Sequence, residues 1–209
     1  MINVFIADDH AIVRQGLKQI VSDADDMAVI GEAENGGDAL RQLRQSAPDV
    51  LILDIAMPVK GGIDVLKLIH KEKPKLPVLI LSMYPEDQYA VRLIRAGASG
   101  YLTKESAPEQ LVMAIRTLAQ GRKYLTPQVA ELLAHEVSVG SQAPHAALSD
   151  REHKVFLSLA SGKTVSQIAS DLVLSVKTIS TYRMRVLEKM GLHSNAELTQ
   201  YAFKNKLLE

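Results

Sequence analysis

The sequence predicts a doubly wound α/β domain with a five-stranded parallel sheet, followed by a smaller all-α domain of four helices. Through the first 120 residues, short runs of β-branched and aliphatic residues alternate with stretches in which apolar residues recur every three or four positions. From Leu148 onward the pattern is helical throughout. A chain of 209 residues is long enough for two domains of these sizes.

Short apolar runs mark the strands of the first domain. The inner runs are continuously apolar, as expected when helices cover both faces of a parallel sheet. Between the runs lie amphipathic helices, and in the first of these Val13, Leu17 and Ile20 share one face. The predicted strands span residues 2–7, 28–33, 50–53, 77–81 and 100–103.

The chain then divides into three predicted parts. We expect the first domain to occupy residues 1–121, a linker with a short helix to occupy 122–147, and the helical domain to occupy 148–209. The linker contains SVGSQAPHAA, a segment of mostly small and polar residues with Pro and Gly.

The helical domain contains a short helix, a tight turn and a longer helix, the order of a helix-turn-helix. Its predicted helices lie within SDREHKVFLSLASG, TVSQIASDL, SVKTISTYRMRVLEKMG and SNAELTQYAFKN.

Composition narrows the class of protein. There is no cysteine, which excludes a disulfide framework and a thiolate metal site. No apolar run reaches the length of a membrane span, and the N-terminus lacks the features of a signal peptide, so we expect a cytoplasmic protein without membrane contact.

The two predicted domains differ in charge. Residues 1–120 carry 13 basic and 16 acidic side chains, whereas residues 148–209 carry nine and six. This difference fits a cation or phosphate site followed by a domain that binds a polyanion.

Polar side chains follow the strands of the first domain. Asp8 and Asp9 follow the first strand, Asp54 the third, Ser82 the fourth and Lys104 the fifth. Because ligands of a doubly wound sheet bind beyond the carboxyl ends of its strands, these side chains are expected to meet at one edge. Converging carboxylates repel one another and require a cation. Oxygen ligands without His or Cys favour a hard ion, so we predict Mg²⁺.

This set of groups is suited to phosphoryl transfer. Asp54 is central and is the expected nucleophile, which would form an acyl phosphate. The cation and the ammonium of Lys104 would neutralise phosphoryl oxygens, and the hydroxyl of Ser82 would donate a hydrogen bond.

The motifs ADDH, LDIAMPVKGG, LSM and GYLTK occur in this order and resemble the receiver domain of bacterial two-component response regulators. The resemblance covers about residues 1–120 and implies a flavodoxin-like fold. It also implies that a histidine kinase donates the phosphoryl group to Asp54. In the implied magnesium site, Asp8 and Asp9 hold the ion, Asp9 directly, together with Asp54 and the backbone carbonyl of Ala56. Ser82 and Tyr101 match the family's switch positions.

The longer helix of the second domain has the charge of a nucleic-acid-binding helix. It carries four basic residues against one acid, and one side is apolar through Val176, Ile179, Val186, Leu187 and Met190. Ser180 and Thr181 are placed to reach base edges, and Arg183 is expected to extend to a phosphate. The predicted DNA-binding residues are Lys177, Thr178, Ser180, Thr181, Tyr182, Arg183, Met184 and Arg185.

Residues 148–202 resemble the DNA-binding domain of the NarL/FixJ (LuxR-type) family. The matching motifs are L-S-x-R-E, A-x-G-K-T, L-S-x-K-T-I and A-E-L. The two resemblances together imply a transcription factor for double-stranded DNA. They imply that phosphorylation of Asp54 promotes homodimerisation and promoter binding.

Two other functions remain open on the sequence alone. Asp54 is also the nucleophile expected of an aspartyl-phosphate phosphatase, but such enzymes usually place a second acid where this chain has Ala56. We therefore expect no enzyme, apart from slow Mg²⁺-dependent self-phosphorylation and self-dephosphorylation. The other alternative is a DNA-binding protein that works without phosphorylation and keeps the first domain as a structural part.

Overall fold

The computed structural model describes the chain except residues 58–60, 140–142, 206 and 209, and the side chains of 135–139. Part of the LDIAMPVKGG motif and part of the predicted linker therefore lie outside the described residues. The chain forms two compact units, Met1–Glu131 and Leu132–Glu209. None of the helices in the described part combines the length and apolar content needed to cross a bilayer.

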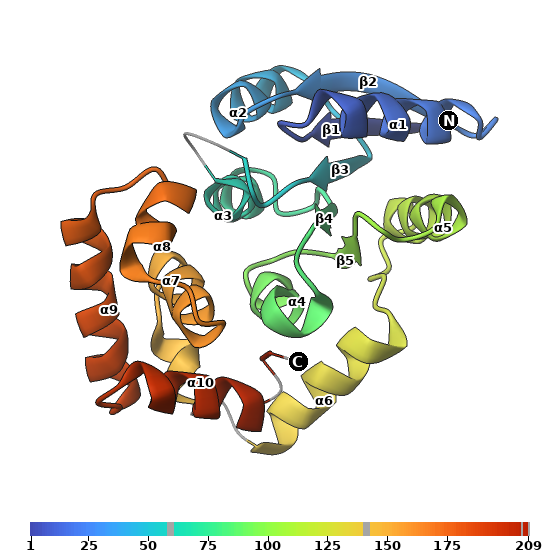
Figure 1. Ribbon diagram of the computed structural model, residues 1–209. Helices are drawn as coiled ribbons and strands as arrows, with labels where there is room; N and C mark the ends of the chain where they lie inside the picture. Colours follow the sequence, from blue (N-terminus) through green and yellow to red (C-terminus); the bar gives the residue numbers. More distant parts are fainter. Residues whose placement is uncertain (58–60, 140–142, 206, 209) are drawn as a thin grey trace. The chain divides into compact units, whose positions relative to one another are not determined.

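The first unit is a five-stranded parallel sheet flanked by helices (Figure 1). Its strand order is β2-β1-β3-β4-β5, the flavodoxin-like order, which confirms the predicted fold class. The strands are β1 (Ile2–Ala7), β2 (Met27–Ala33), β3 (Val50–Leu53), β4 (Val78–Ser82) and β5 (Gly100–Thr103). The helices are α1 (Ala11–Ser22), α2 (Gly36–Gln45), α3 (Gly62–Glu72), α4 (Glu86–Arg95) and α5 (Pro108–Ala119).

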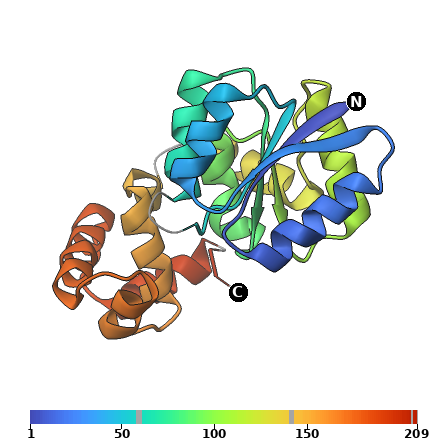
Figure 2. The ribbon, with the colours of Figure 1, turned by 90° about the horizontal axis from the view of Figure 1, so that it is seen from above.

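Strands and helices share a dense apolar core. Every residue of β3 and β4 is buried, because helices cover both faces of these inner strands. Figure 2 shows α1 and α5 on one face of the sheet and α2 and α3 on the other. The core on the α1/α5 face includes alternate strand residues and residues of both helices: Val4, Ile6, Val50, Ile52, Leu79, Leu17, Val21, Leu111 and Ile115.

Backbone hydrogen bonds align the strand ends that carry the polar residues. The Asp54 N–H donates to the Ala7 carbonyl at 2.8 Å, and the Lys104 N–H donates to the Ser82 carbonyl at 2.8 Å. The ladder therefore continues one residue beyond β3 and β5. It fixes side chains from distant parts of the sequence at one edge of the sheet.

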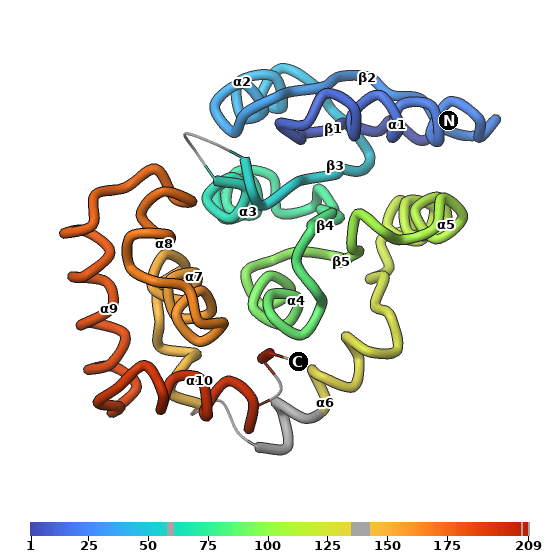
Figure 3. Tube along the Cα trace, in the orientation of Figure 1, coloured from blue at the N-terminus to red at the C-terminus, as the bar shows by residue number. Residues whose placement is uncertain are grey.

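The chain after α5 remains attached to the first unit (Figure 3). The Tyr124 N–H donates to the Ser99 carbonyl at 3.0 Å, and Tyr124 forms a parallel bridge with Gly100. The Thr126 hydroxyl donates to the Glu86 carboxylate at 2.7 Å, at the first turn of α4. These contacts hold Tyr124 and Thr126 to the first unit, which extends to Glu131. The predicted domain limits at 121 and 147 stay predictions.

The second unit is helical, and each of its main helices begins at a capped residue. Ser149 and Thr164 form capping boxes with Glu152 and Gln167, and Gly191 ends α9 in the left-handed conformation (φ 64°). The helices are α6 (Pro127–Val139), which spans both units, the 3-10 turn η1 (Pro144–Ala147), α7 (Asp150–Ala160), α8 (Val165–Asp171), α9 (Val176–Met190) and α10 (Asn195–Lys204). The four predicted helices are those from α7 to α10.

A buried carboxylate joins α7 to α9. Glu152 is 3% exposed, and its Oε2 accepts from Lys189 Nζ at 2.6 Å and from the Ser149 N–H at 2.8 Å. Burial alone would raise the pKa of Glu152, but these hydrogen bonds hold it below its ordinary value. Glu152 therefore stabilises the domain in its ionised form.

We predict that Glu152→Gln lowers the stability of the second unit by about 1 kcal/mol at pH 7, because the charge-assisted bond to Lys189 is lost. A carboxylate whose pKa is lower in the folded than in the unfolded state stabilises the fold at pH values above its unfolded-state pKa. This contribution to stability is lost as the pH falls through the folded-state pKa. The difference in stability between wild type and Glu152→Gln should thus shrink below about pH 4. Hydrogen exchange of α7 and α9 peptides measures it. The exposed Glu188→Gln is the control, and an unchanged difference at low pH would contradict the assignment.

Candidate phosphoacceptor site and nucleic-acid interface

Two buried carboxylates share one ammonium group at the carboxyl edge of the sheet. Asp8 and Asp54 are each 1% exposed. Lys104 Nζ lies 2.6 Å from Asp8 Oδ2 and donates to Asp54 Oδ2 at 2.8 Å. The predicted convergence of Asp8, Asp54 and Lys104 is therefore present in the structure. Each charge has a partner, as burial requires.

The electrostatics of this triad favour a charged lysine. Burial raises the pKa of Asp54 above its ordinary value, although hydrogen bonds from Lys104 and the Ala56 N–H act in the opposite direction. Burial would lower the pKa of Lys104, but the hydrogen bonds and charges of Asp54 and Asp8 more than offset this and raise it. Lys104 thus stays an ammonium next to the Asp54 oxygens.

Asp9 and His10 complete a cluster of metal-ligand atoms. Asp9 is partly exposed, and its Oδ1 lies 2.9 Å from His10 Nδ1. Ligand atoms of Asp8, Asp9, His10 and Asp54 all lie within 4.8 Å of one another. The three carboxylates form a donor set that suits a hard divalent cation. His10 is half exposed, and its ring Nδ1 lies among the carboxylates, 3.2 Å from Asp8 Oδ1 and 2.9 Å from Asp9 Oδ1.

The hydroxyls of Ser82 and Tyr101 meet at the backbone of one residue. Both side chains are fully buried. The Tyr84 N–H donates to Ser82 Oγ at 3.1 Å, and Tyr101 Oη donates to the Tyr84 carbonyl at 2.7 Å. Burial raises the pKa of the Tyr101 phenol, so it remains a donor. The backbone of Tyr84 is therefore in contact with both hydroxyl groups.

Sequence reasoning did not identify three further groups that shape the acidic pocket, which is formed by Asp8, Asp9 and Asp54. Arg14 Nη1 donates to the Asp8 carbonyl at 2.7 Å, and the Ala56 N–H donates to Asp54 Oδ1 at 2.9 Å. Gly62 lies so close that an added Cβ would come within 2.0 Å of the Asp54 carbonyl oxygen. Arg14 lies one helical turn after His10, which is the only sequence signal for its position. The metal contact of the Ala56 carbonyl stays a prediction.

The α9 helix exposes four of its eight predicted DNA-binding side chains. Ile179, Val186 and Met190 are buried, as predicted for the apolar side. Val176, expected on this side, is 51% exposed, because it is the first residue of α9 and directly follows an exposed turn. Among the predicted DNA contacts, Lys177, Ser180, Met184 and Arg185 are exposed, and Thr178, Thr181, Tyr182 and Arg183 are half-buried.

Several polar groups of α9 already have partners within the domain. The Thr178 hydroxyl lies 2.8 Å from that of Ser175 at the N-cap, and Arg183 Nε donates to Asn195 Oδ1 at 2.7 Å. Arg183 is therefore held against the start of α10. Its predicted contact with a phosphate would use the remaining guanidinium nitrogens.

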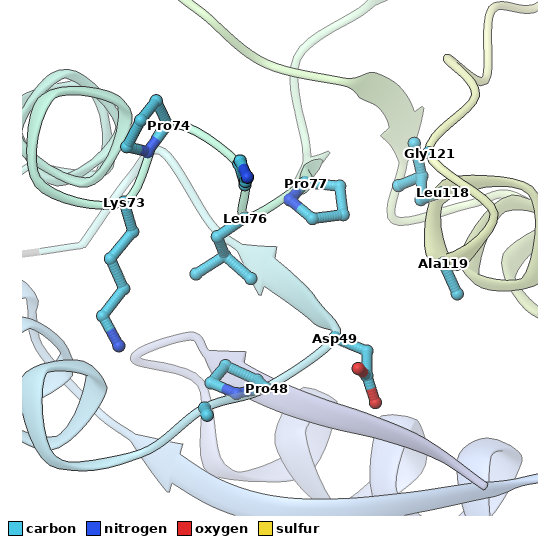
Figure 4. A pocket seen from close by; sticks show the side chains of 11 residues that line it. Pro48, Asp49, Lys73, Pro74, Leu76, Pro77, Leu118, Ala119 and Gly121 are labelled. Carbon is cyan, nitrogen blue, oxygen red and sulfur yellow. The ribbon is translucent and has the colours of Figure 1, made fainter.

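A separate hollow of about 640 Å³ lies at the amino-terminal ends of β3 and β4, away from the acidic pocket (Figure 4). Pro48, Pro74 and Pro77 line it. Lys73 donates to the Ser46 carbonyl at 2.7 Å, and Asp49 accepts from the Asn3 N–H at 2.7 Å. The side chains of Lys73 and Asp49 are thus bound to the backbone at this end of the sheet.

Known families match both units. Residues 4–116 match the response regulator receiver domain, and residues 146–202 match the luxR family of bacterial regulatory proteins. The chain is a response regulator of the NarL/FixJ family. Its α9 accordingly belongs to a LuxR-type DNA-binding domain, and the chain is a DNA-binding transcriptional response regulator.

Relatives match this response regulator along its whole length. GacA of Pseudomonas aeruginosa is 36% identical over 211 residues, covering 100% of this chain and 99% of that protein. UvrY of Escherichia coli is 35% identical over 209 residues, covering 99% and 96%. A structure of RcsB from Salmonella enterica serovar Typhimurium, bound to promoter P1flhDC with the phosphomimetic BeF3⁻, is 30% identical with a TM-score of 0.65, covering 96% of this chain and 97% of that one.

Removing the ammonium from the acidic pocket should destabilise the receiver domain in a pH-dependent way. Lys104→Met leaves Asp8 and Asp54 buried without a cation, and we expect a loss of about 3–5 kcal/mol at pH 7.5 in EDTA. Unpaired buried carboxylates have raised pKa values, so the loss should shrink towards pH 5 as the folded protein takes up protons. Urea unfolding followed by circular dichroism at both pH values measures this. The exposed Lys71→Met is the control, and a pH-independent loss would indicate packing of the lysine stem instead.

Gly62 should tolerate no side chain, unlike its neighbour. We predict that Gly62→Ala costs about 1–3 kcal/mol, because the methyl group must displace the backbone of Asp54. Gly61→Ala is the matched control, since its nearest atom is the Ile55 carbonyl oxygen at 3.9 Å. Thermal unfolding of both variants tests the difference. Equal melting temperatures would contradict the close approach.

Proposed function

We propose that phosphorylation of Asp54 by a histidine kinase controls DNA binding by this response regulator. The observation that carries the proposal is the environment of the Asp54 carboxylate. It is buried at the centre of the pocket, with an ammonium on Oδ2 and a backbone N–H on Oδ1. These donors orient the carboxylate and are placed to stabilise added negative charge.

In the proposed reaction an Asp54 oxygen attacks the phosphorus atom of a phosphohistidine. The O–P bond forms, the P–N bond to the imidazole of the kinase breaks, and the imidazole nitrogen leaves with the electron pair. Asp8, Asp9, Asp54 and the Ala56 carbonyl would hold Mg²⁺, which supplies charge neutralisation when bound. Lys104 pairs with one phosphoryl oxygen and the Ser82 hydroxyl donates to another.

The proposed switch follows from the shared contact at Tyr84. When the Ser82 hydroxyl turns to the phosphoryl group, it leaves the Tyr84 N–H and alters the backbone that also accepts from Tyr101. The ring of Tyr84 packs against that of Tyr89 in α4, with the centroids 4.9 Å apart and the rings tilted by 44°. The change would therefore reach α4, promote homodimerisation and favour binding to repeated half-sites on promoter DNA.

We further propose that the protein is not a turnover enzyme and acts in the cytoplasm, where it meets promoter DNA. Ala56 supplies no side-chain acid or base two residues after the nucleophile. Self-phosphorylation from small phosphodonors and self-dephosphorylation would consequently be slow.

The test is intact mass after incubation with acetyl phosphate and Mg²⁺. We expect wild type to gain one phosphoryl group and Asp54→Ala to gain none, with the exposed Asp64→Ala variant behaving as wild type. Phosphorylated wild type should then bind promoter-containing genomic fragments more tightly than Asp54→Ala. No mass gain in wild type, or equal DNA affinity in both, would favour a DNA-binding protein that works without phosphorylation.

A further inference from the structure

Large apolar side chains are exposed on and beside the recognition helix α9. Among the described residues of the second unit, Val173 is 90% exposed, Val176 51%, Met184 63% and Phe203 52%. Three of these four belong to α9 or to the turn before it. Met184 lies in the middle of α9, where water surrounds a side chain that favours an apolar partner.

Met184 lies on the face of α9 that is opposite the core. Lys177, Thr181 and Met184 are spaced four and three residues apart, so they lie on one face, and the buried Ile179 and Val186 lie on the other. The Thr181 hydroxyl donates to the Lys177 carbonyl at 3.0 Å. This intrahelical bond uses the polar branch of Thr181 and leaves its methyl group for outside contact.

The charges around Met184 indicate what covers it. Glu188, one turn after Met184, is exposed on the same side, while the exposed cations Lys177 and Arg185 lie near this face and match DNA phosphates in charge. An apolar protein surface would bury these two charges without partners, which is costly. A DNA major groove, in contrast, offers phosphates to Lys177 and Arg185 and base edges to Met184, so we infer that DNA covers this face.

The major groove offers one apolar feature, the C5-methyl group of thymine. The centre of the exposed face of α9 lacks the Arg, Asn or Gln side chains that pair with base edges through two hydrogen bonds. A methionine is flexible and polarisable, and it adapts to apolar contacts of irregular shape.

We propose that Met184, together with the Thr181 methyl group, contacts thymine C5-methyl groups, so that this protein selects A·T pairs by methyl contact. The proposal rests on the proposed function, because it takes the phosphorylated protein as the form that binds DNA, and it specifies the chemistry by which bases are recognised. Ser180, exposed beside this face, would add a hydroxyl contact to a base edge.

The test replaces thymine by deoxyuridine, which removes only the methyl group. A preferred duplex is first selected from random DNA with phosphorylated full-length wild type, and each thymine of that duplex is then replaced singly. We expect one or two positions per half-site at which uracil weakens binding about four-fold, the effect of one buried methyl group. Replacements in the flanking DNA should have no effect.

Variants then assign the effect to Met184. Met184→Ala should bind the thymine and uracil duplexes equally, whereas Met184→Leu, which keeps an apolar side chain, should retain the preference. Met113→Ala, which removes an exposed methionine from α5 of the receiver domain, is the matched control and should also retain it. The Leu variant and far-ultraviolet circular dichroism distinguish lost recognition from lost folding.

Two outcomes would overturn the proposal. One is that uracil binds as well as thymine at every position in wild type, and the other is that the thymine preference persists in Met184→Ala. In the second case, a changed oligomeric state of Met184→Ala would assign the side chain to a protein interface. Failure of phosphorylated wild type to select any sequence would instead overturn the proposed function itself.

Discussion

The structure of the receiver domain depends on the buried ion pairs that Lys104 makes with Asp8 and Asp54. Both carboxylates are removed from water at the edge of the sheet, and such a pair of like charges is stable only with a cation between them. Lys104 supplies that cation from the position directly after β5, the last strand of the sheet. The interaction ties three strand ends together and keeps negative groups in place for a ligand of positive or phosphoryl character.

Hydrogen bonds link the carboxyl edge of the sheet, where these ion pairs lie, to α4 and to the segment that follows α5. Ser82 and Tyr101 both contact the backbone of Tyr84, which leads into α4. The first turn of α4 carries Glu86, which accepts from Thr126 in the segment leaving the sheet. These contacts join the carboxyl edge of the sheet to the start of the connection that leads to the second unit.

The DNA-binding domain is organised differently, because its helices define their own ends. Serine or threonine caps α7, α8, α9 and α10, and each cap accepts from a backbone N–H three residues later. These local bonds set where α9 begins. Packing against α7 then decides which of its faces remains available for DNA.

The sequence by itself determined the order and type of the elements, because strand and helix periodicities and cap residues are local signals. It also placed Asp8, Asp54, Ser82 and Lys104 at strand ends, and parallel topology alone implies that such ends meet. Only the tertiary structure decided that Arg14 holds the Asp8 carbonyl, that Gly62 contacts the Asp54 backbone and that Val176 is exposed. These features arise from how separate elements approach one another, and side-chain packing across elements leaves no periodic trace in a single sequence.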